Sequence, residues 1–280
     1  MYKLPTLQEL LEAGVHFGHQ VRRGHPRMKP YIYGAREGVH IIDLTKSEQY
    51  LEEAAEFVYK LASEGKVLLF VGTKKQAMPI VEEAAKRLEA PYMVERWMGG
   101  FLTNFEEMKK RIKLLKELKE QKEKGQLAKY TKKEQLLLDR KMEKLQRDFR
   151  GVMDLTALPD AIFVTDAVSE NIAVREANRL KIKVVSIADS NCNPSELDFP
   201  IPGNDDAIKS IKILVEAVAS AYEEGKKEAG KIKIAKEKKE DEEKQKAEKA
   251  AAVSVKIVEE VAAIEEKVEK ETVKDFEKKV

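Results

Sequence analysis

The sequence has little of the features that define several common protein classes. Its single cysteine, Cys192, excludes an intramolecular disulfide framework and fits a reducing cytoplasm. It contains no apolar run near the ~20 residues that a membrane-spanning helix needs. Its first residues also lack the apolar core of a secretory signal. We therefore expect a soluble cytoplasmic protein with no membrane partner.

Sequence motifs for nucleotide binding and catalysis are also missing. The chain has no G-x-G-x-x-G, no G-x-x-x-x-G-K-[ST] and no G-x-S-x-G. Cys192 lies in the polar run DSNCNP, and the last histidine in the sequence is His40, so a histidine could activate the thiol only from a distance. We predict no catalytic residue, no cofactor and no small-molecule substrate.

Charge is abundant, and its two signs are segregated along the chain. Charged residues make up 36% of the sequence, yet the net charge is only +2. Residues 1–36 hold 6 Lys and Arg against 2 Asp and Glu, and residues 106–150 hold 16 against 9. Residues 151–224 reverse the balance, with 6 against 13. This pattern predicts a basic face and an acidic face on one molecule.

Apolar runs alternate with amphipathic segments from residue 67 onward. The predicted strands are Val67–Val71, Tyr92–Val94, Ala161–Thr165 and Val184–Ala188. The predicted helices are Lys74–Leu88, Val168–Leu180 and Asp205–Tyr222. Strands that are apolar throughout and alternate with helices are typical of a parallel sheet covered on both faces. The fold class is therefore α/β, a mainly parallel sheet flanked by helices in a Rossmann-like arrangement.

The segment before this region predicts smaller elements. Capping boxes at Thr6 with Glu9 and at Thr45 with Glu48 predict the starts of two helices. Residues 15–36 are punctuated by Gly and Pro and read as irregular, apart from a short strand at Tyr31–Tyr33 that pairs with Val39–Ile42.

The stretch from about residue 104 to residue 150 is a different kind of element. Met108, Ile112 and Leu115 recur at helical spacing, and so do Leu138, Met142, Leu145 and Phe149 after a third capping box at Thr131 with Glu134. An antiparallel coiled-coil hairpin, protruding as an arm, explains both runs. We predict a globular domain over residues 1–105 and 151–224, the arm over 106–150, and a Lys/Glu/Ala/Val-rich tail over 225–280, disordered or partly helical.

Residues 16–36 carry the clearest binding chemistry. They hold five cations and no acidic residue, interleaved with aromatic and glycine residues. Arginine forks suit phosphates, aromatic rings offer stacking faces, and glycines let the backbone approach closely. The pattern favours RNA binding over a merely solvated basic loop. The cations are Arg22, Arg23, Arg27, Lys29 and Arg36.

Three other stretches have two interpretations each. RWMGGFLTN (96–104) contains Trp97, which could anchor the base of the arm to the core, while Arg96 could meet a phosphate. VLLFVGTKKQA (67–77) brings Lys74 and Lys75 near a helix start, which could bind an anion. His16, His19, Asp189 and Asp205, with Asp206, could supply metal ligands, but two histidines alone favour a structural role, so we predict no metal.

Six segments, taken in their order along the chain, resemble the ribosomal protein S2 family of the bacterial small subunit. The carrying segments are LLEAGVHFGHQ (10–20), PRMKPYIYGAREGVHIIDLTK (26–46), VLLFVGTKKQA (67–77), RWMGGFLTN (96–104), LPDAIFVTD (158–166) and PIPGNDDAIKSI (200–211).

The resemblance implies a structural, non-enzymatic and ribosome-associated protein. It implies binding to 16S rRNA between the head and body of the small subunit, contacts with other small-subunit proteins, and help in docking ribosomal protein S1 for translation initiation. We expect RNA contacts from Arg22, Arg23, Arg27, Lys29, Arg36, Lys74, Lys75, Arg96, Trp97, Lys109, Lys110, Arg111 and Lys113. The alternatives are a Rossmann-like nucleotide-dependent enzyme and an adaptor that binds proteins without RNA.

Overall fold

The computed structural model describes residues 2–231, except the side chains of residues 128 and 129. The chain divides into two units, Met1–Ala229 and Gly230–Val280, and the elements below belong to the first unit up to residue 229. Most of the predicted tail, residues 232–280, lies outside the described residues.

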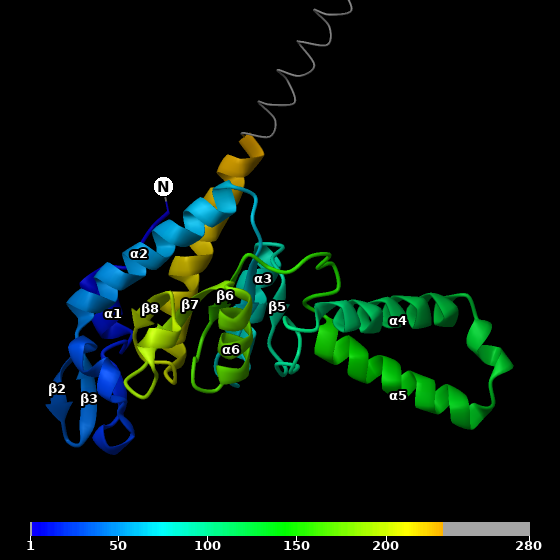
Figure 1. The fold of residues 1–280 in the computed structure, drawn as a ribbon, viewed down its shortest axis with the longest axis horizontal. Coiled ribbons are helices and arrows are strands. Elements are labelled where there is room, and N and C mark those ends of the chain that lie inside the picture. Colours follow the sequence, from blue (N-terminus) through cyan, green and yellow to red (C-terminus); the bar gives the residue numbers. More distant parts are fainter. Residues whose placement is uncertain (1, 232–280) are drawn as a thin grey trace, which may run out of the picture. The chain divides into compact units, whose positions relative to one another are not determined.

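A five-stranded parallel sheet forms the centre of the first unit, in the order β5-β4-β6-β7-β8 (Figure 1). The strands are β4 (Leu68–Val71), β5 (Tyr92–Met93), β6 (Ala161–Val164), β7 (Lys183–Ala188) and β8 (Phe199–Pro202). This arrangement confirms the predicted α/β class. The sequence prediction missed β8, because Pro200 and Pro202 interrupt its pattern; proline is tolerated there because β8 is an edge strand.

Successive residues of the central strands enter two different cores. In β4, Leu68 and Phe70 pack into one cluster, whereas Leu69 and Val71 pack into the other. The first cluster includes α2 (Leu44–Ser63), α3 (Met78–Arg87) and the helix of residues 208–231; the second includes α4 (Phe105–Glu123) and α6 (Asn171–Leu180). Because side chains alternate across a strand, a sheet covered on both faces needs apolar residues at every position.

The N-terminal segment is more regular than predicted. After α1 (Leu7–Glu12), β1 (Phe17–Gln20), β3 (Val39–Ile42) and β2 (Ile32–Arg36) form an antiparallel sheet in the order β1-β3-β2. Two short 3₁₀ helices, η1 (Val21–Arg23) and η2 (Pro26–Tyr31), connect β1 to β2. The prediction of an irregular 15–36 stretch was therefore wrong, because pairing with β3 orders strands that are too short to stand out in the sequence.

Helices α4 and α5 (Lys132–Phe149) lie side by side (Figure 1). The residues that the spacing singled out are the buried or half-buried ones of these helices, including Ile112, Leu115 and Phe149. The capping box of Thr131 with Glu134 is present, and Gly125 has the left-handed φ of +67° before η3 (Gln126–Lys129). The capping box of Thr6 with Glu9 is also present.

Four helix starts differ from the sequence prediction; one is that of the last described helix, which begins at residue 208 rather than at Asp205. The N-cap of α2 is Asp43, whose carboxylate accepts from the backbone N–H of Thr45, so Thr45 lies in the first turn. α3 begins at Met78 rather than Lys74, and α6 begins at Asn171 rather than Val168. Within residues 2–231, no helix is both long and apolar enough to cross a membrane.

Candidate nucleic-acid interface

The basic N-terminal segment is fixed to the carboxyl end of the parallel sheet. Met28 of η2 is fully buried, with its sulfur 4.0 Å from Cys192 Sγ. The His25 backbone N–H donates to the Ser190 carbonyl over 2.8 Å. Gly18 packs so tightly that a Cβ there would lie 2.9 Å from Ser190 Oγ. The cations of this segment therefore stand on a rigid base.

All five predicted cations of this segment are exposed, and few have an acidic partner. Arg36 has a loose ion pair with Glu37 at 3.8 Å, and Arg27 Nη1 donates to Asn193 Oδ1 at 3.5 Å. Arg22, Arg23 and Lys29 have no ion pair to an acidic side chain among the described residues. The exposed cations are Arg22, Arg23, Arg27, Lys29 and Arg36.

Exposed aromatic rings accompany these charges. The side chain of Tyr33 on β2 is 82% exposed, and that of Phe17 on β1 is 50% exposed. Single exposed rings are common on protein surfaces, but rings close to arginines match the stacking and phosphate contacts through which proteins bind single-stranded RNA. Exposed cations and exposed rings thus occur together on the small sheet and on the two 3₁₀ helices that connect β1 to β2.

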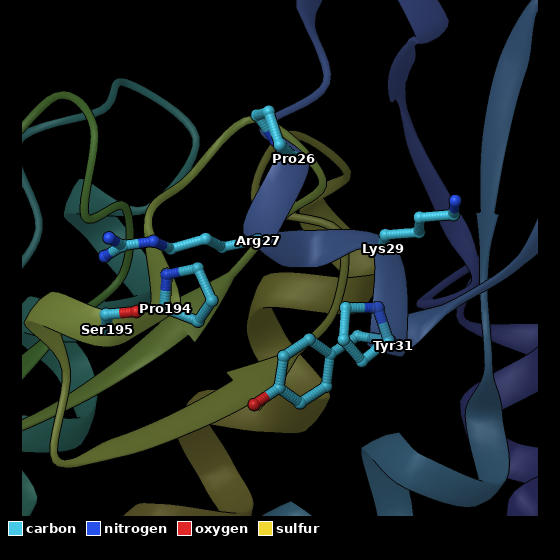
Figure 2. A pocket seen from close by; sticks show the side chains of 7 residues that line it. Pro26, Arg27, Lys29, Tyr31, Pro194 and Ser195 are labelled. Atoms are coloured by element: carbon cyan, nitrogen blue, oxygen red, sulfur yellow. The ribbon is translucent and has the colours of Figure 1, made fainter.

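Beside this sheet, η2 and η4 (Pro194–Glu196) enclose an open pocket of about 660 Å³, which we call the η2–η4 pocket (Figure 2). Its lining joins residues far apart in the sequence and includes no acidic side chain. The lining residues are Pro26, Arg27, Lys29, Pro30, Tyr31, Pro194 and Ser195.

Lys74 takes a different place from the one its motif predicts. Its ammonium group lies 2.7 Å from Asp166, 2.8 Å from Asp205 and 2.8 Å from Asp206, and its side chain is only 18% exposed. Burial by itself would lower the pKa of Lys74. The negative charge of Asp205 and the hydrogen bonds to the three aspartates outweigh burial and raise this pKa. Three carboxylates thus match the charge of Lys74 inside the protein.

The aspartates around Lys74 also work against a nucleotide site. Asp166 follows β6, Asp189 follows β7 and Asp205 follows β8, so the carboxyl edge where α/β proteins bind ligands carries negative charge. Gly72 after β4 serves packing, because a Cβ there would lie 2.8 Å from Thr165 Oγ1 and 2.9 Å from Val81. A phosphate at this edge would meet repulsion.

His19 belongs to the same cluster. Its Nδ1 lies 3.1 Å from Asp189 and its Nε2 lies 3.5 Å from Asp206, and the hydrogen bond with Asp189 raises the pKa of His19. Burial, and then the charges of Asp166 and Asp189, raise the pKa of Asp205 to about 7.

The structure brings only some of the candidate metal ligands close to one another. His19, Asp205 and Asp206 offer ligand atoms within 4.8 Å of one another, and this is the group among the described residues that could hold a metal ion. His16 is separate from it: its ring contacts Phe17, and its buried Nδ1 has no hydrogen-bond partner.

The RWMGGFLTN stretch is anchored by a residue that no sequence pattern indicated, Glu176 of α6. One carboxylate oxygen accepts from Trp97 Nε1 and the Gly100 N–H, and the other accepts from Leu102 and both donors of Thr103. Trp97 is only 6% exposed and contacts Phe101. Trp97 therefore packs at the base of α4, whereas its neighbour Arg96 is exposed.

The predicted cations of α4 differ in how their charges are matched. Lys109 and Lys110 pair with Glu106 and Glu107 at 3.0 and 2.6 Å, and Lys113 is 3.9 Å from Glu117. Arg111 and, before α3, Lys75 are exposed and have no ion pair within residues 2–231. Helix α5 has a larger set of exposed cations without such a pair, which our sequence reasoning missed: Lys132, Lys133, Arg140, Lys141 and Lys144.

Comparison with known proteins places this architecture in one family. The model of the family described as ribosomal protein S2 matches residues 10–225. The small ribosomal subunit protein uS2 of Nitratiruptor sp. is 51% identical over 221 residues, which is 79% of this chain and 83% of that protein. The uS2 proteins of Wolinella succinogenes and Dictyoglomus thermophilum are each 50% identical, over 80% and 79% of this chain and 83% and 89% of their own lengths. The chain belongs to the ribosomal protein S2 family, which is a family of structural proteins and not of enzymes.

Proposed function

We propose that this protein is a structural component of the small ribosomal subunit in the cytoplasm and binds 16S rRNA between the head and body through its basic N-terminal segment. The observation that carries the proposal is the set of five exposed cations at residues 22–36, fixed on a buried base and almost free of acidic partners. Family membership supports the assembly, since the relatives are named as proteins of that subunit.

We propose a narrower RNA-binding set than the sequence predicted. Exposed Lys75, Arg96 and Arg111 remain in the proposed interface, together with the lysines of α4, whose surface ion pairs are weak enough to exchange for phosphate contacts. Lys74 and Trp97 are left out, because one is neutralised and the other is buried. The exposed cations of α5 are added. In this proposal the arm of residues 106–150 is a second RNA-binding element beside the α/β domain of residues 1–105 and 151–224.

Protein contacts form the second part of the proposal. Residues 151–224 hold 13 acidic against 6 basic residues, so the surface they contribute suits basic neighbours better than RNA. We assign the contacts with other small-subunit proteins to this region. We also propose that the protein, once assembled into the subunit, supports the docking of ribosomal protein S1. The tail of residues 225–280 has no role in the proposal.

The test is binding of purified protein to small subunits depleted of their own copy, at several salt concentrations. The variant Arg22→Glu with Arg27→Glu should bind much more weakly. Its slope of log affinity against log salt should fall by about two, since each phosphate contact contributes roughly 0.9. The matched control is Arg175→Glu with Arg179→Glu on α6, where both arginines are exposed and have no acidic partner among the described residues. Equal binding by the two variants would show that the RNA interface lies elsewhere.

A further inference from the structure

The η2–η4 pocket is preformed, which is the first requirement for a specific binding site. Three prolines in its wall hold their backbone φ near −65°. The Tyr31 carbonyl accepts from the Asp43 N–H over 3.0 Å, and the Tyr31 ring lies edge-on to Tyr50 with centroids 5.2 Å apart. These contacts and the burial of Met28 hold the η2 wall in place, and Pro194 of the η4 wall is itself buried.

The chemistry of the lining fits a base between two phosphates. The exposed rings of Pro26 and Pro30 and the half-buried ring of Tyr31 present apolar and aromatic surface, whereas Pro194 is buried. The two cations supply the only charges of the wall. In Figure 2, Arg27 extends toward Pro194 and Ser195, whereas Lys29 points away to the opposite side. In this arrangement the two cations face different sides of the pocket. They are placed for two phosphates, on either side of whatever fills the pocket.

We propose that the η2–η4 pocket receives one unpaired nucleotide of the RNA, with its base against Tyr31 and the exposed rings of Pro26 and Pro30, and its flanking phosphates at Arg27 and Lys29. This inference rests on the proposed function and adds to it a specific recognition mode. A nucleotide in a strand has a phosphate on each side, which matches the diverging cations. The guanidinium of Arg27 has five N–H donors and spends one on a 3.5 Å contact with Asn193, so a bidentate phosphate contact remains open.

Ser195→Leu is the variant that separates the pocket from the general basic surface. Ser195 is exposed. The substitution keeps the hydrogen bond from the Ser195 backbone N–H to Asn193 Oδ1, because it changes only the side chain. The larger side chain would occupy the pocket without altering charge. Ser63→Leu, at a half-buried serine at the end of α2, is the control for added apolar surface. Both variants are first checked for an unchanged melting temperature.

The experiment measures affinity of the full-length variants for depleted small subunits, again at several salt concentrations. Loss of one stacked base should weaken binding of Ser195→Leu roughly 5- to 150-fold, with no change in salt slope, because no phosphate contact is removed. Arg27→Gln should instead lower the slope by about one. Wild-type affinity for Ser195→Leu would overturn the pocket proposal while leaving the proposed function intact.

Ultraviolet crosslinking of the bound complex identifies the occupant. The peptide containing Tyr31 should carry a nucleotide adduct in the wild type and lose it in Ser195→Leu. A chemical crosslink from this peptide to another protein, without a nucleotide adduct, would overturn the proposal in favour of a peptide occupant. Failure of the wild type itself to bind small subunits would overturn the proposed function and this inference together.

Discussion

Glu176 joins α6 to the loop that leads into α4, and its replacement tests how that loop is held. Its two carboxylate oxygens accept five hydrogen bonds, from Trp97, Gly100, Leu102 and two donors of Thr103. Glu176→Gln keeps the shape, but in either orientation the amide nitrogen faces at least two N–H donors. The side chain of Glu176 is 8% exposed, so water cannot easily take over the lost contacts.

The cost follows from the number of donors left without an acceptor. Each lost hydrogen bond to a charged group is worth about 1.5–3 kcal/mol, so two of them predict a loss of about 3–6 kcal/mol of unfolding free energy. At about 2–4 °C per kcal/mol for a domain of this size, the melting temperature should fall by roughly 6–24 °C. Glu216→Gln is the control, because Glu216 pairs with Arg87 at the surface and should cost about 1 kcal/mol or less.

Two measurements check this prediction. Thermal unfolding by circular dichroism gives the stability change. Fluorescence of the only tryptophan, Trp97, reports the loop itself and should shift to the red in Glu176→Gln as the indole loses its acceptor and gains water. A melting temperature within about 2 °C of wild type, with unchanged emission, would refute the reasoning, since ~3 kcal/mol corresponds to at least 6 °C.

Three further predictions concern the rest of the described chain. Because the folded-state pKa values of His19 and Asp205 are both raised, folding takes up protons, so stability is fully present at low pH and falls as the pH rises through about 7. The melting temperature should therefore drop between pH 5 and pH 8, with a shallower slope in Asp205→Asn; a rise over this range would contradict the assignment. Gly225→Ala should lower the free energy of unfolding by about 1–3 kcal/mol, because the added Cβ would lie 2.5 Å from the Tyr59 carbonyl oxygen. In Gly230→Ala, in the same helix, the added Cβ meets nothing within 4 Å, so this control should be neutral or stabilising. Chemical denaturation measures both. Burial raises the pKa of Cys192, so a thiol reagent should modify it slowly in the native protein and rapidly in denaturant, and equal rates would mean that the site opens readily.

Local patterns in the sequence determined the class of the fold. The strands at residues 68–71 and 161–164 are apolar at every position because both of their faces are covered, and this signal needs no knowledge of the partner. The capping boxes at Thr6 and Thr131 and the helical spacing in α4 and α5 act within a few residues of one another, so the sequence alone was sufficient for them. The five exposed cations of residues 22–36 were also predicted, because a dense basic run with no acidic residue has few ways to be neutralised locally.

Only the tertiary structure decided which candidate residues face solvent. Lys74 looked like an anion-binding lysine until the fold brought it Asp166 and Asp205, which lie 92 and 131 positions away in the sequence. Trp97 is buried in the apolar core, where Glu176 of α6 accepts its N–H. The η2–η4 pocket exists because residues 26–31 meet residues 194 and 195. The physical reason is common to all three: burial and charge pairing depend on neighbours that the chain path brings together, and the spacing of residues along the sequence does not encode that path locally.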